Sequence, residues 1–195
     1  MSKIDPSALD QLFIKARTAN GFLDKPVSIA LLQEVYDIAK MGATSMNGQP
    51  TRYVFLMSPE SRARLLPALI PGNHEKTKTA PVTVIVATDT QFYDHLPQIW
   101  HGPNAREMFA GNATLAQSTA QRNGTLGGAY FMMAARSVGL DCGPMSGLDL
   151  GKVNAEFFPD GRLQANFVIN LGYGDNSKLF NRNPRLTFEQ ACTVL

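Results

Sequence analysis

The run from Val82 to Thr88, VTVIVAT, constrains the fold of this chain more than any other stretch. Every position is apolar or β-branched, and the alternation that marks a strand with one face in solvent is missing. Such a run is typical of a central strand that is covered on both faces. The sequence therefore predicts an α+β layer structure, in which helices flank a small sheet on both sides.

The other elements follow from the same periodicity arguments. Two more strands are predicted, at 53–57 (YVFLM) and 163–174 (LQANFVINLGYG), and the Gly- and Pro-containing stretch 141–149 is interpreted as a loop. Helices are predicted to begin near Pro6, Ser28, Ser58 and Thr187, and to span 112–138 and 151–158. The apolar face of the first helix is expected to be buried; it comprises Leu9, Leu12, Phe13 and Ala16.

One segment, 89–112, shows no clean period. It mixes aromatic residues, two prolines and two histidines. Long irregular segments in compact domains are often lids. We therefore predict one or two short helices in a mobile, lid-like excursion from a single domain that spans residues 1–195.

The longest predicted helix contains three glycines, Gly124, Gly127 and Gly128. A glycine inside a helix costs about 1 kcal/mol relative to alanine, so three together indicate close approach of another helix or a ligand. Only 17% of the residues are charged, against about 25% in an average domain. The low charge favours extra buried surface, such as an oligomer interface.

Charge and cysteine content exclude several classes of function. A net charge of +2 without a basic run argues against nucleic acid, and no apolar stretch is long enough to cross a bilayer. The two cysteines, Cys142 and Cys192, form neither a disulfide framework nor a zinc-spaced cluster. We expect a soluble cytoplasmic protein without a bound metal.

Polar islands beside the regular elements are the candidate binding groups. Five basic residues could neutralise a phosphate: Arg17, Lys76, Lys178, Arg182 and Arg185. Side-chain amides at Asn47, Gln49 and Asn73 can pair with the imide edge of a ring, and the stretch 143–147 offers bare backbone. Together they predict a phosphorylated aromatic cofactor. No catalytic triad order, P-loop or Rossmann turn is present.

These islands resemble, in order and over nearly the whole chain, the FMN-site motifs of the nitroreductase family. RTANGF (17–22) is similar to the family's R-S-x-R-x-F, and ATSMNGQPTRY (43–53) to its A-P/T-S-x-x-N-x-Q-P-W-R-F. NHEK (73–76) resembles N-x-x-K, and GLDCGPMSGLD (139–149) resembles G-L-G-x-x-P-x-x-G-F-D. Asn20 replaces the second basic residue of the first motif.

The resemblance implies a nitroreductase-like three-layer fold with a mostly antiparallel sheet and a long central helix at a homodimer interface. FMN would lie between the two subunits, and NADPH or NADH would reduce it. The implied cofactor-binding residues are Arg17, Thr18, Asn20, Ser45, Asn47, Gln49, Asn73, Lys76, Pro144, Met145, Ser146, Gly147 and Arg185. Close packing against the partner would then explain the three helix glycines.

Within the family, the stretches INLGYGDNSKLF and PRLTFEQA are most similar to a branch that reduces malonic semialdehyde to 3-hydroxypropanoate in pyrimidine degradation. That substrate needs a cation for its carboxylate and a proton for its aldehyde oxygen. Arg52, Arg106 or Arg122 could supply the first, and water, Tyr93 or His101 the second. A broad nitroaromatic or quinone reductase and a non-catalytic flavin-binding dimer remain the alternatives.

Overall fold

A four-stranded antiparallel sheet forms the centre of the computed structural model, which describes residues 2–195. The strand order is β1-β2-β4-β3. The strands are β1 (Thr51–Leu56), β2 (Val82–Asp89), β3 (Asp141–Met145) and β4 (Leu163–Gly172). All eight residues of β2 are buried, as the uninterrupted apolar run predicts.

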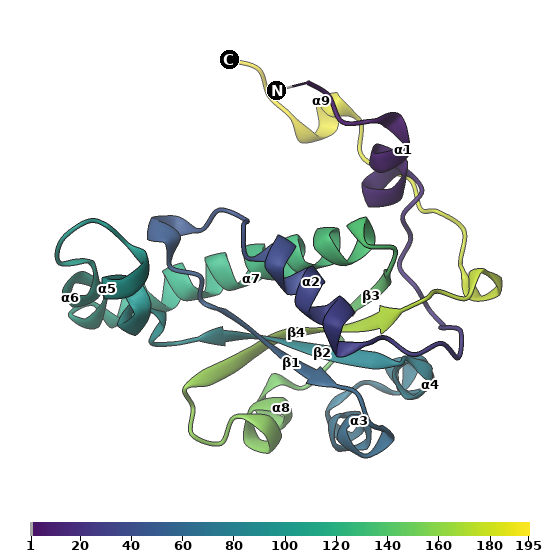
Figure 1. Cartoon of the computed structure of the whole chain (residues 1–195), viewed down its shortest axis with the longest axis horizontal. Helices are drawn as coiled ribbons and strands as arrows, with labels where there is room; N and C mark the ends of the chain where they lie inside the picture. Colours follow the sequence, from purple (N-terminus) through teal and green to yellow (C-terminus); the bar gives the residue numbers. More distant parts are fainter. Residues whose placement is uncertain (1) are drawn as a thin grey trace.

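Helices cover both faces of the sheet (Figure 1). On one side lie α2 (Ile29–Ala39) and α7 (Ala113–Ser137), and on the other α3 (Pro59–Leu65), α4 (His74–Thr79) and α8 (Leu150–Phe157). Alternate residues of β2 point to the two cores: Val84 packs with α2 and α7, whereas Ile85 packs with α3 and α8. The predicted three-layer α+β architecture is therefore confirmed.

The interpretation of 141–149 as a loop was wrong for its first half. Asp141–Met145 is the edge strand β3, in which Cys142 lies opposite Leu171 and Met145 opposite Val168. Pro144 and Gly143 suggested a turn, but an edge strand tolerates both. Glycine is also needed at 143, because a Cβ there would lie 2.5 Å from the carbonyl oxygen of Ala19.

The excursion between β2 and α7 forms short helical pieces. These are a 3₁₀ turn (Phe92–His95), α5 (Leu96–Ile99) and α6 (Ala105–Ala110). Phe92, Leu96 and Phe109 are buried and pack against the first turns of α7. The excursion thus has a small core of its own, separate from the two cores on the sheet.

The three glycines of α7 face the sheet of their own chain, so the sequence-based explanation by a partner helix was wrong. A Cβ would meet Thr88 at Gly124, Thr51 at Gly127 and Phe167 at Gly128, at 2.4, 1.9 and 2.4 Å. All three glycines are buried. Their lack of side chains lets α7 lie directly on β1, β2 and β4.

Replacing Gly127 by alanine is expected to destabilise the fold by about 2 kcal/mol. The added Cβ would lie 1.9 Å from Thr51 Oγ1, which puts the overpacking cost near the upper end of about 1–3 kcal/mol, and the gain in helix propensity offsets only about 1 kcal/mol of it. For a chain of this size the melting temperature should fall by roughly 4–8 °C. Thr51→Ala in the same chain should restore part of the loss, since it removes Thr51 Oγ1, 1.9 Å from the added Cβ, but keeps Thr51 Cβ, 2.8 Å from it. Gly72→Ala is the control, because nothing lies within 4 Å of its Cβ position; equal melting of all variants would contradict this packing.

Both ends of the chain project from the body (Figure 1). The N-terminal arm carries α1 (Pro6–Leu9) and a π turn (Asp10–Ile14), and the C-terminal arm, residues 180–195, carries α9 (Phe188–Ala191). The predicted capping box of Thr187 and Gln190 is present. The expected buried face of the first helix is not buried: Leu9 is 39% exposed and Phe13 55% exposed.

Apolar side chains are exposed along both arms. They are Ile4, Leu9, Phe13, Ile14, Phe180, Leu186, Phe188, Val194 and Leu195. The arms contact each other near the body, where Arg182 Nη2 donates to the carbonyl oxygens of Ile14 and Ala16 at 2.7 and 2.8 Å. So much exposed apolar surface is typical of a region that another chain covers.

The two cysteines differ in environment. Burial raises the pKa of Cys142 to about 12, whereas Cys192 is exposed on the C-terminal arm. None of the helices within residues 2–195 combines the length and hydrophobicity needed to span a bilayer. In the same part of the chain, no three His, Cys, Asp or Glu side chains gather as a metal site would require.

Candidate functional site

Nine of the predicted site residues gather around β3, and we call them the β3 cluster. They are Arg17, Thr18, Asn20, Asn73, Lys76, Pro144, Met145, Ser146 and Gly147. At the start of the strand, Thr18 forms a bridge with Cys142, and the N–H of Ala19 donates to the Cys142 carbonyl at 3.0 Å. Beyond its end, the buried Asn73 donates from Nδ2 to the Gly147 carbonyl at 3.0 Å.

The β3 cluster is elongated. From Cys142 to Gly147 the chain advances five residues, roughly 16 Å at the usual rise of a strand. Arg17 lies at one end of this distance, and Asn73 and Gly147 lie at the other. The cluster can therefore bind the two ends of one elongated ligand. Arg17 offers a cation to an anionic end, and Asn73 and the backbone of Gly147 offer amide groups to a polar ring.

At the Gly147 end, the neighbouring atoms leave no room for a side chain at position 147. A Cβ at Gly147 would lie 2.6 Å from Ile70 Cδ1 and 3.1 Å from Asn73 Nδ2. One turn further on, burial lowers the pKa of Lys76, and no carboxylate within residues 2–195 lies close enough for an ion pair with it. A partly desolvated ammonium group without a counter-ion is suited to an anionic ligand.

Three further predicted residues, Ser45, Asn47 and Gln49, lie on a loop in front of β1. The loop contains three non-glycine residues with positive φ: Met46 at 52°, Asn47 at 51° and Gln49 at 41°. Such conformations persist only where surrounding contacts enforce them, and they concentrate at functional sites. Here Ser45 N donates to Asn123 Oδ1 and Asn47 Nδ2 to the Ile99 carbonyl, both at 2.8 Å.

Within one chain, loop 45–49 and the β3 cluster are far apart. The loop leads into Thr51, which pairs with Thr88 at one edge and one end of the sheet. β3 forms the opposite edge, and Cys142 pairs with Leu171 at the other end. Three strand spacings alone separate the edges by roughly 14 Å. The structure therefore divides the predicted residues into two sets.

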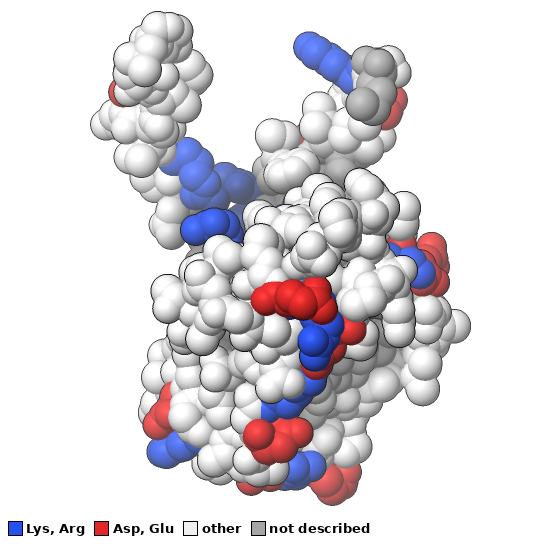
Figure 2. All heavy atoms as spheres, turned by 90° about the vertical axis from the view of Figure 1, so that its left-hand side faces the viewer, with Lys and Arg blue, Asp and Glu red and all other residues white. Residues whose placement is uncertain are grey.

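The last predicted residue, Arg185, belongs to neither set. It lies on the exposed C-terminal arm, where Nη1 donates to the carbonyls of Asn183 and Pro184 at 2.9 and 3.2 Å. Arg17, in contrast, donates to the Phe180 carbonyl, so the start of this arm passes beside the β3 cluster. Figure 2 shows Lys and Arg side chains gathered where the two arms leave the body.

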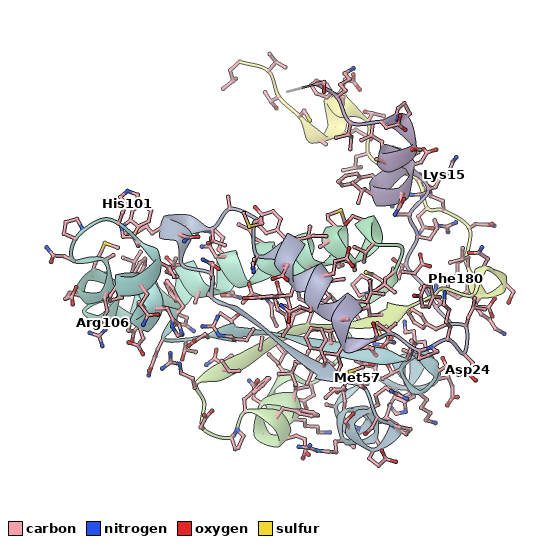
Figure 3. The ribbon with its side chains drawn as sticks, in the orientation of Figure 1. Lys15, Asp24, Met57, His101, Arg106 and Phe180 are labelled. Carbon is pink, nitrogen blue, oxygen red and sulfur yellow. The ribbon has the colours of Figure 1, made fainter. Side chains whose placement is uncertain are left out.

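Two of the three arginines considered for a substrate carboxylate are already paired. Arg52 contacts Asp89 at 2.7 Å and Arg106 contacts Asp94 at 3.2 Å. Arg122 is exposed on α7 without an ion pair among residues 2–195. Of the candidate proton donors, His101 is exposed and lies on the excursion with Arg106 (Figure 3).

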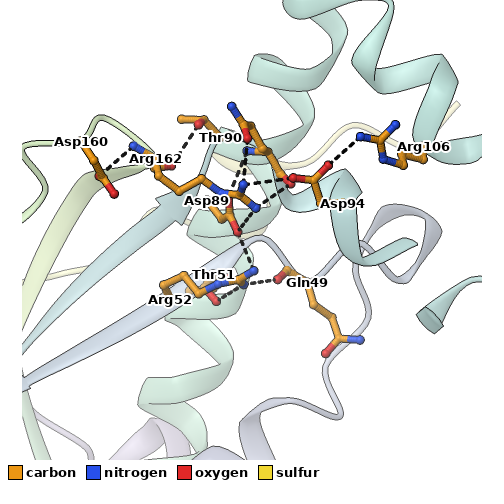
Figure 4. A network of polar contacts seen from close by, with 10 residues as sticks. Gln49, Thr51, Arg52, Asp89, Thr90, Asp94, Arg106, Asp160 and Arg162 are labelled. Carbon is orange, nitrogen blue, oxygen red and sulfur yellow. Dashed lines mark hydrogen bonds and ion pairs between the residues drawn. The ribbon is translucent and has the colours of Figure 1, made fainter. Parts of the chain in front are cut away.

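Sequence reasoning missed the ion-pair network around Asp89. Asp89, Asp94, Arg52, Arg106 and Arg162 form it, and we call it the Asp89 network (Figure 4). The one available signal was an aspartate at the end of an otherwise uncharged, buried strand. Its arginine partners are 37 and 73 residues away in the chain, so no local pattern connects them.

A cavity of about 540 Å³ lies beside loop 45–49, between α2, β1 and the excursion. Polar and aromatic residues share its lining, among them Gln49, Arg52, His95, Gln98 and Tyr130. The loop and the excursion are thus two walls of the same space.

Comparison with known proteins identifies relatives over the full length. A chain from Ralstonia nicotianae is 52% identical over 195 residues, covering 100% of both proteins, and one from Burkholderia lata is 52% identical over 194 residues with the same coverage. Both are described as "Putative NADH dehydrogenase/NAD(P)H nitroreductase".

Solved structures share the fold at much lower identity. A nitroreductase-type protein from Bacillus subtilis superposes with a TM-score of 0.84 at 20% identity, covering 98% of this chain and 100% of that one. One from Exiguobacterium sibiricum, solved in complex with FMN, gives 0.85 at 16% identity over 100% of both chains. The profile of the Nitroreductase family matches residues 15–173. With this match and full-length relatives at half identity, the chain belongs to the Nitroreductase family.

Proposed function

We propose that this chain is an FMN-dependent NAD(P)H oxidoreductase that works as a homodimer and reduces malonic semialdehyde to 3-hydroxypropanoate. The observation that carries the proposal is the β3 cluster, which offers a cation at one end and amide, ammonium and bare backbone at the other. The names of the relatives from Ralstonia and Burkholderia support the NAD(P)H dependence, and the FMN complex from Exiguobacterium supports the cofactor. A cytoplasmic setting is part of the proposal.

The residues present fit FMN. Arg17 would bind the phosphate, with Thr18 and Asn20 beside it on the N-terminal segment that pairs with Cys142 at the start of β3. Asn73 is buried and held by its bond to Gly147, so its Oδ1 can accept a hydrogen bond from the ring. Gly147 and its neighbours Pro144, Met145 and Ser146 would lie along the ring face, where the backbone can approach closely.

A second copy of the chain would bring the two sets of residues together. Loop 45–49 cannot reach its own β3 cluster across the sheet, but the loop of a partner can. The outward face of α7, opposite its glycines, exposes Leu115 and Leu126 to 36% and 41%, and both arms carry exposed apolar side chains. We therefore place the homodimer seam along α7 and the arms, with Ser45, Asn47 and Gln49 facing the partner's cofactor.

When bound, FMN supplies the hydride exchange between NAD(P)H and the substrate. The chain's own residues then bind and orient. Lys76 lies in surroundings that lower its pKa, and an anionic ring edge beside it would stabilise its charged form. Arg122 is the remaining unpaired candidate for the substrate carboxylate, because Asp89 and Asp94 already hold Arg52 and Arg106.

The proposal is tested by anaerobic mixing of flavin-loaded protein with NADPH or NADH and then with 3-oxopropanoate, while the flavin absorbance is followed. We expect bleaching in the first step and rapid recovery in the second. Arg122→Gln should slow the recovery with 3-oxopropanoate but leave recovery with a neutral quinone unchanged. Protein that takes up FMN but is not bleached by either nucleotide would instead be a non-catalytic flavin-binding dimer.

A second candidate function is a broad nitroaromatic or quinone reductase, and the description of the relatives as nitroreductases favours its nitroaromatic part. It predicts the same bleaching of the flavin by NADPH or NADH. The two functions differ in the second step: for the second candidate, the flavin absorbance would recover quickly with nitroaromatics or quinones and slowly with 3-oxopropanoate.

A further inference from the structure

We propose that Asp89 is a positioning residue that couples the 89–112 excursion to loop 45–49, so that these two walls of the cavity adopt their positions together. The inference rests on the proposed function in one respect, namely that the loop faces a flavin. The coupling itself follows from contacts within the chain.

Asp89 is the buried centre of the network, with 3% of its surface exposed. Its Oδ2 accepts a hydrogen bond from Arg52 Nη2 at 2.7 Å, and its Oδ1 accepts from Arg162 Nε at 2.6 Å. Oδ1 also accepts from the backbone N–H of Gln91 at 2.9 Å. One carboxylate therefore binds two guanidinium groups, those of Arg52 and Arg162 (Figure 4).

The Arg52 branch leads to the loop. Arg52 Nη1 donates to the carbonyl oxygens of Gln49 and Thr51 at 2.9 and 3.0 Å. Gln49 is one of the residues held at positive φ, 41°. The backbone N–H of Asp89 also donates to the Pro50 carbonyl at 2.8 Å. Asp89 thus orients the guanidinium group of Arg52, and that group holds a strained part of the loop in place.

The Arg162 branch leads to the excursion. Arg162 Nη1 donates to Gln91 Oε1 at 2.8 Å and to Asp94 Oδ2 at 3.0 Å. Asp94 in turn pairs with Arg106 on α6 at 3.2 Å. The first turn of the excursion and α6 are therefore connected to the same carboxylate as the loop.

The loop and the excursion also contact each other directly: Asn47 Nδ2 donates to the Ile99 carbonyl, at the end of α5, at 2.8 Å. The loop and the excursion therefore touch each other and share one anchor. Stability alone does not explain that anchor, since well-packed apolar residues often replace buried ion pairs without loss. An arginine fork gives geometric specificity, which suits a device that sets positions.

Hydrogen exchange tests the coupling without any cofactor. In Asp89→Asn, amide exchange should rise at least tenfold in both 42–50 and 90–112. The matched control is Glu156→Gln, which breaks the exposed Arg64–Glu156 pair, also 2.7 Å long, on the far side of the sheet. Faster exchange confined to 90–112 would overturn the inference, because Asp89 would then support the excursion alone.

Arg52→Lys provides a second readout and covers the case in which Asp89→Asn does not fold. Lysine keeps a charge for Asp89 but has no planar fork for the Gln49 and Thr51 carbonyls. We expect the dissociation constant of FMN to rise about tenfold while the melting temperature of the apoprotein stays that of the wild type. Wild-type protein that binds no FMN would refute the proposed function and leave the exchange result intact. FMN binding by Arg52→Lys at wild-type strength would refute the positioning role at the site.

Discussion

A chain that ends at residue 179 is expected to remain folded but to lose self-association and FMN binding together. Residues 180–195 are exposed throughout and add nothing to either core. Yet Phe180, Leu186 and Phe188 expose 74%, 71% and 63% of their surface. Burying one such side chain is worth about 1.5–3 kcal/mol, so the loss of all three should raise the dimer dissociation constant by about 1,000-fold or more.

Sedimentation velocity over a concentration series measures this effect, and the melting temperature of the truncated chain checks its fold. The control is the full-length Phe188→Ser variant, which keeps the arm and should weaken the dimer only in part. A truncated chain that still sediments as a dimer would place the seam on α7 alone. A truncated monomer that binds FMN as tightly as the wild type would show that one chain suffices for the site.

The division of the site between two copies gives the second large effect, which appears on mixing two damaged chains. Arg17→Ala removes the proposed phosphate contact, worth about 1.5–3 kcal/mol for a charged hydrogen bond, and should weaken FMN binding by about 10- to 150-fold. Asn47→Gly removes the loop side chain and keeps the positive φ of 51°, which glycine adopts freely. Each homodimer then has two impaired sites.

A mixed dimer of the two variants contains one intact site and one site with both defects. After co-refolding and separation by differently charged tags, it should bind one FMN per dimer with wild-type affinity. Both homodimers, treated identically, serve as controls. If the mixed dimer binds no better than they do, Arg17 and Asn47 act on the same chain's cofactor, and the arrangement proposed here is wrong.

Regular elements with strong local patterns were predictable from the sequence. The uninterrupted apolar run gave β2, and Asn112 marks the N-terminus of the long helix α7, where it caps the Leu115 N–H. Ser28 likewise caps α2 as expected. In each case the determining interactions lie within a few residues, which is the range over which sequence patterns act.

Features that depend on distant partners were not predictable. β3 was missed because its pairing with β4 outweighs the turn-like residues Gly143 and Pro144. The glycines of α7 were noticed, but their contacts with Thr51, Thr88 and Phe167 arise only in the folded chain. The motif residues were found by resemblance, yet their separation into loop 45–49 and the β3 cluster follows from strand order.

The contrast between the two thiols offers a direct probe of the arm. At neutral pH a maleimide dye should modify Cys192 and spare Cys142, which is buried with its pKa raised to about 12. A single fluorophore would then report from the tip of the chain, where its rotational freedom and labelling rate depend on whether a neighbouring molecule shields that tip. Anisotropy recorded during dilution would therefore time the separation of two copies without any engineered cysteine.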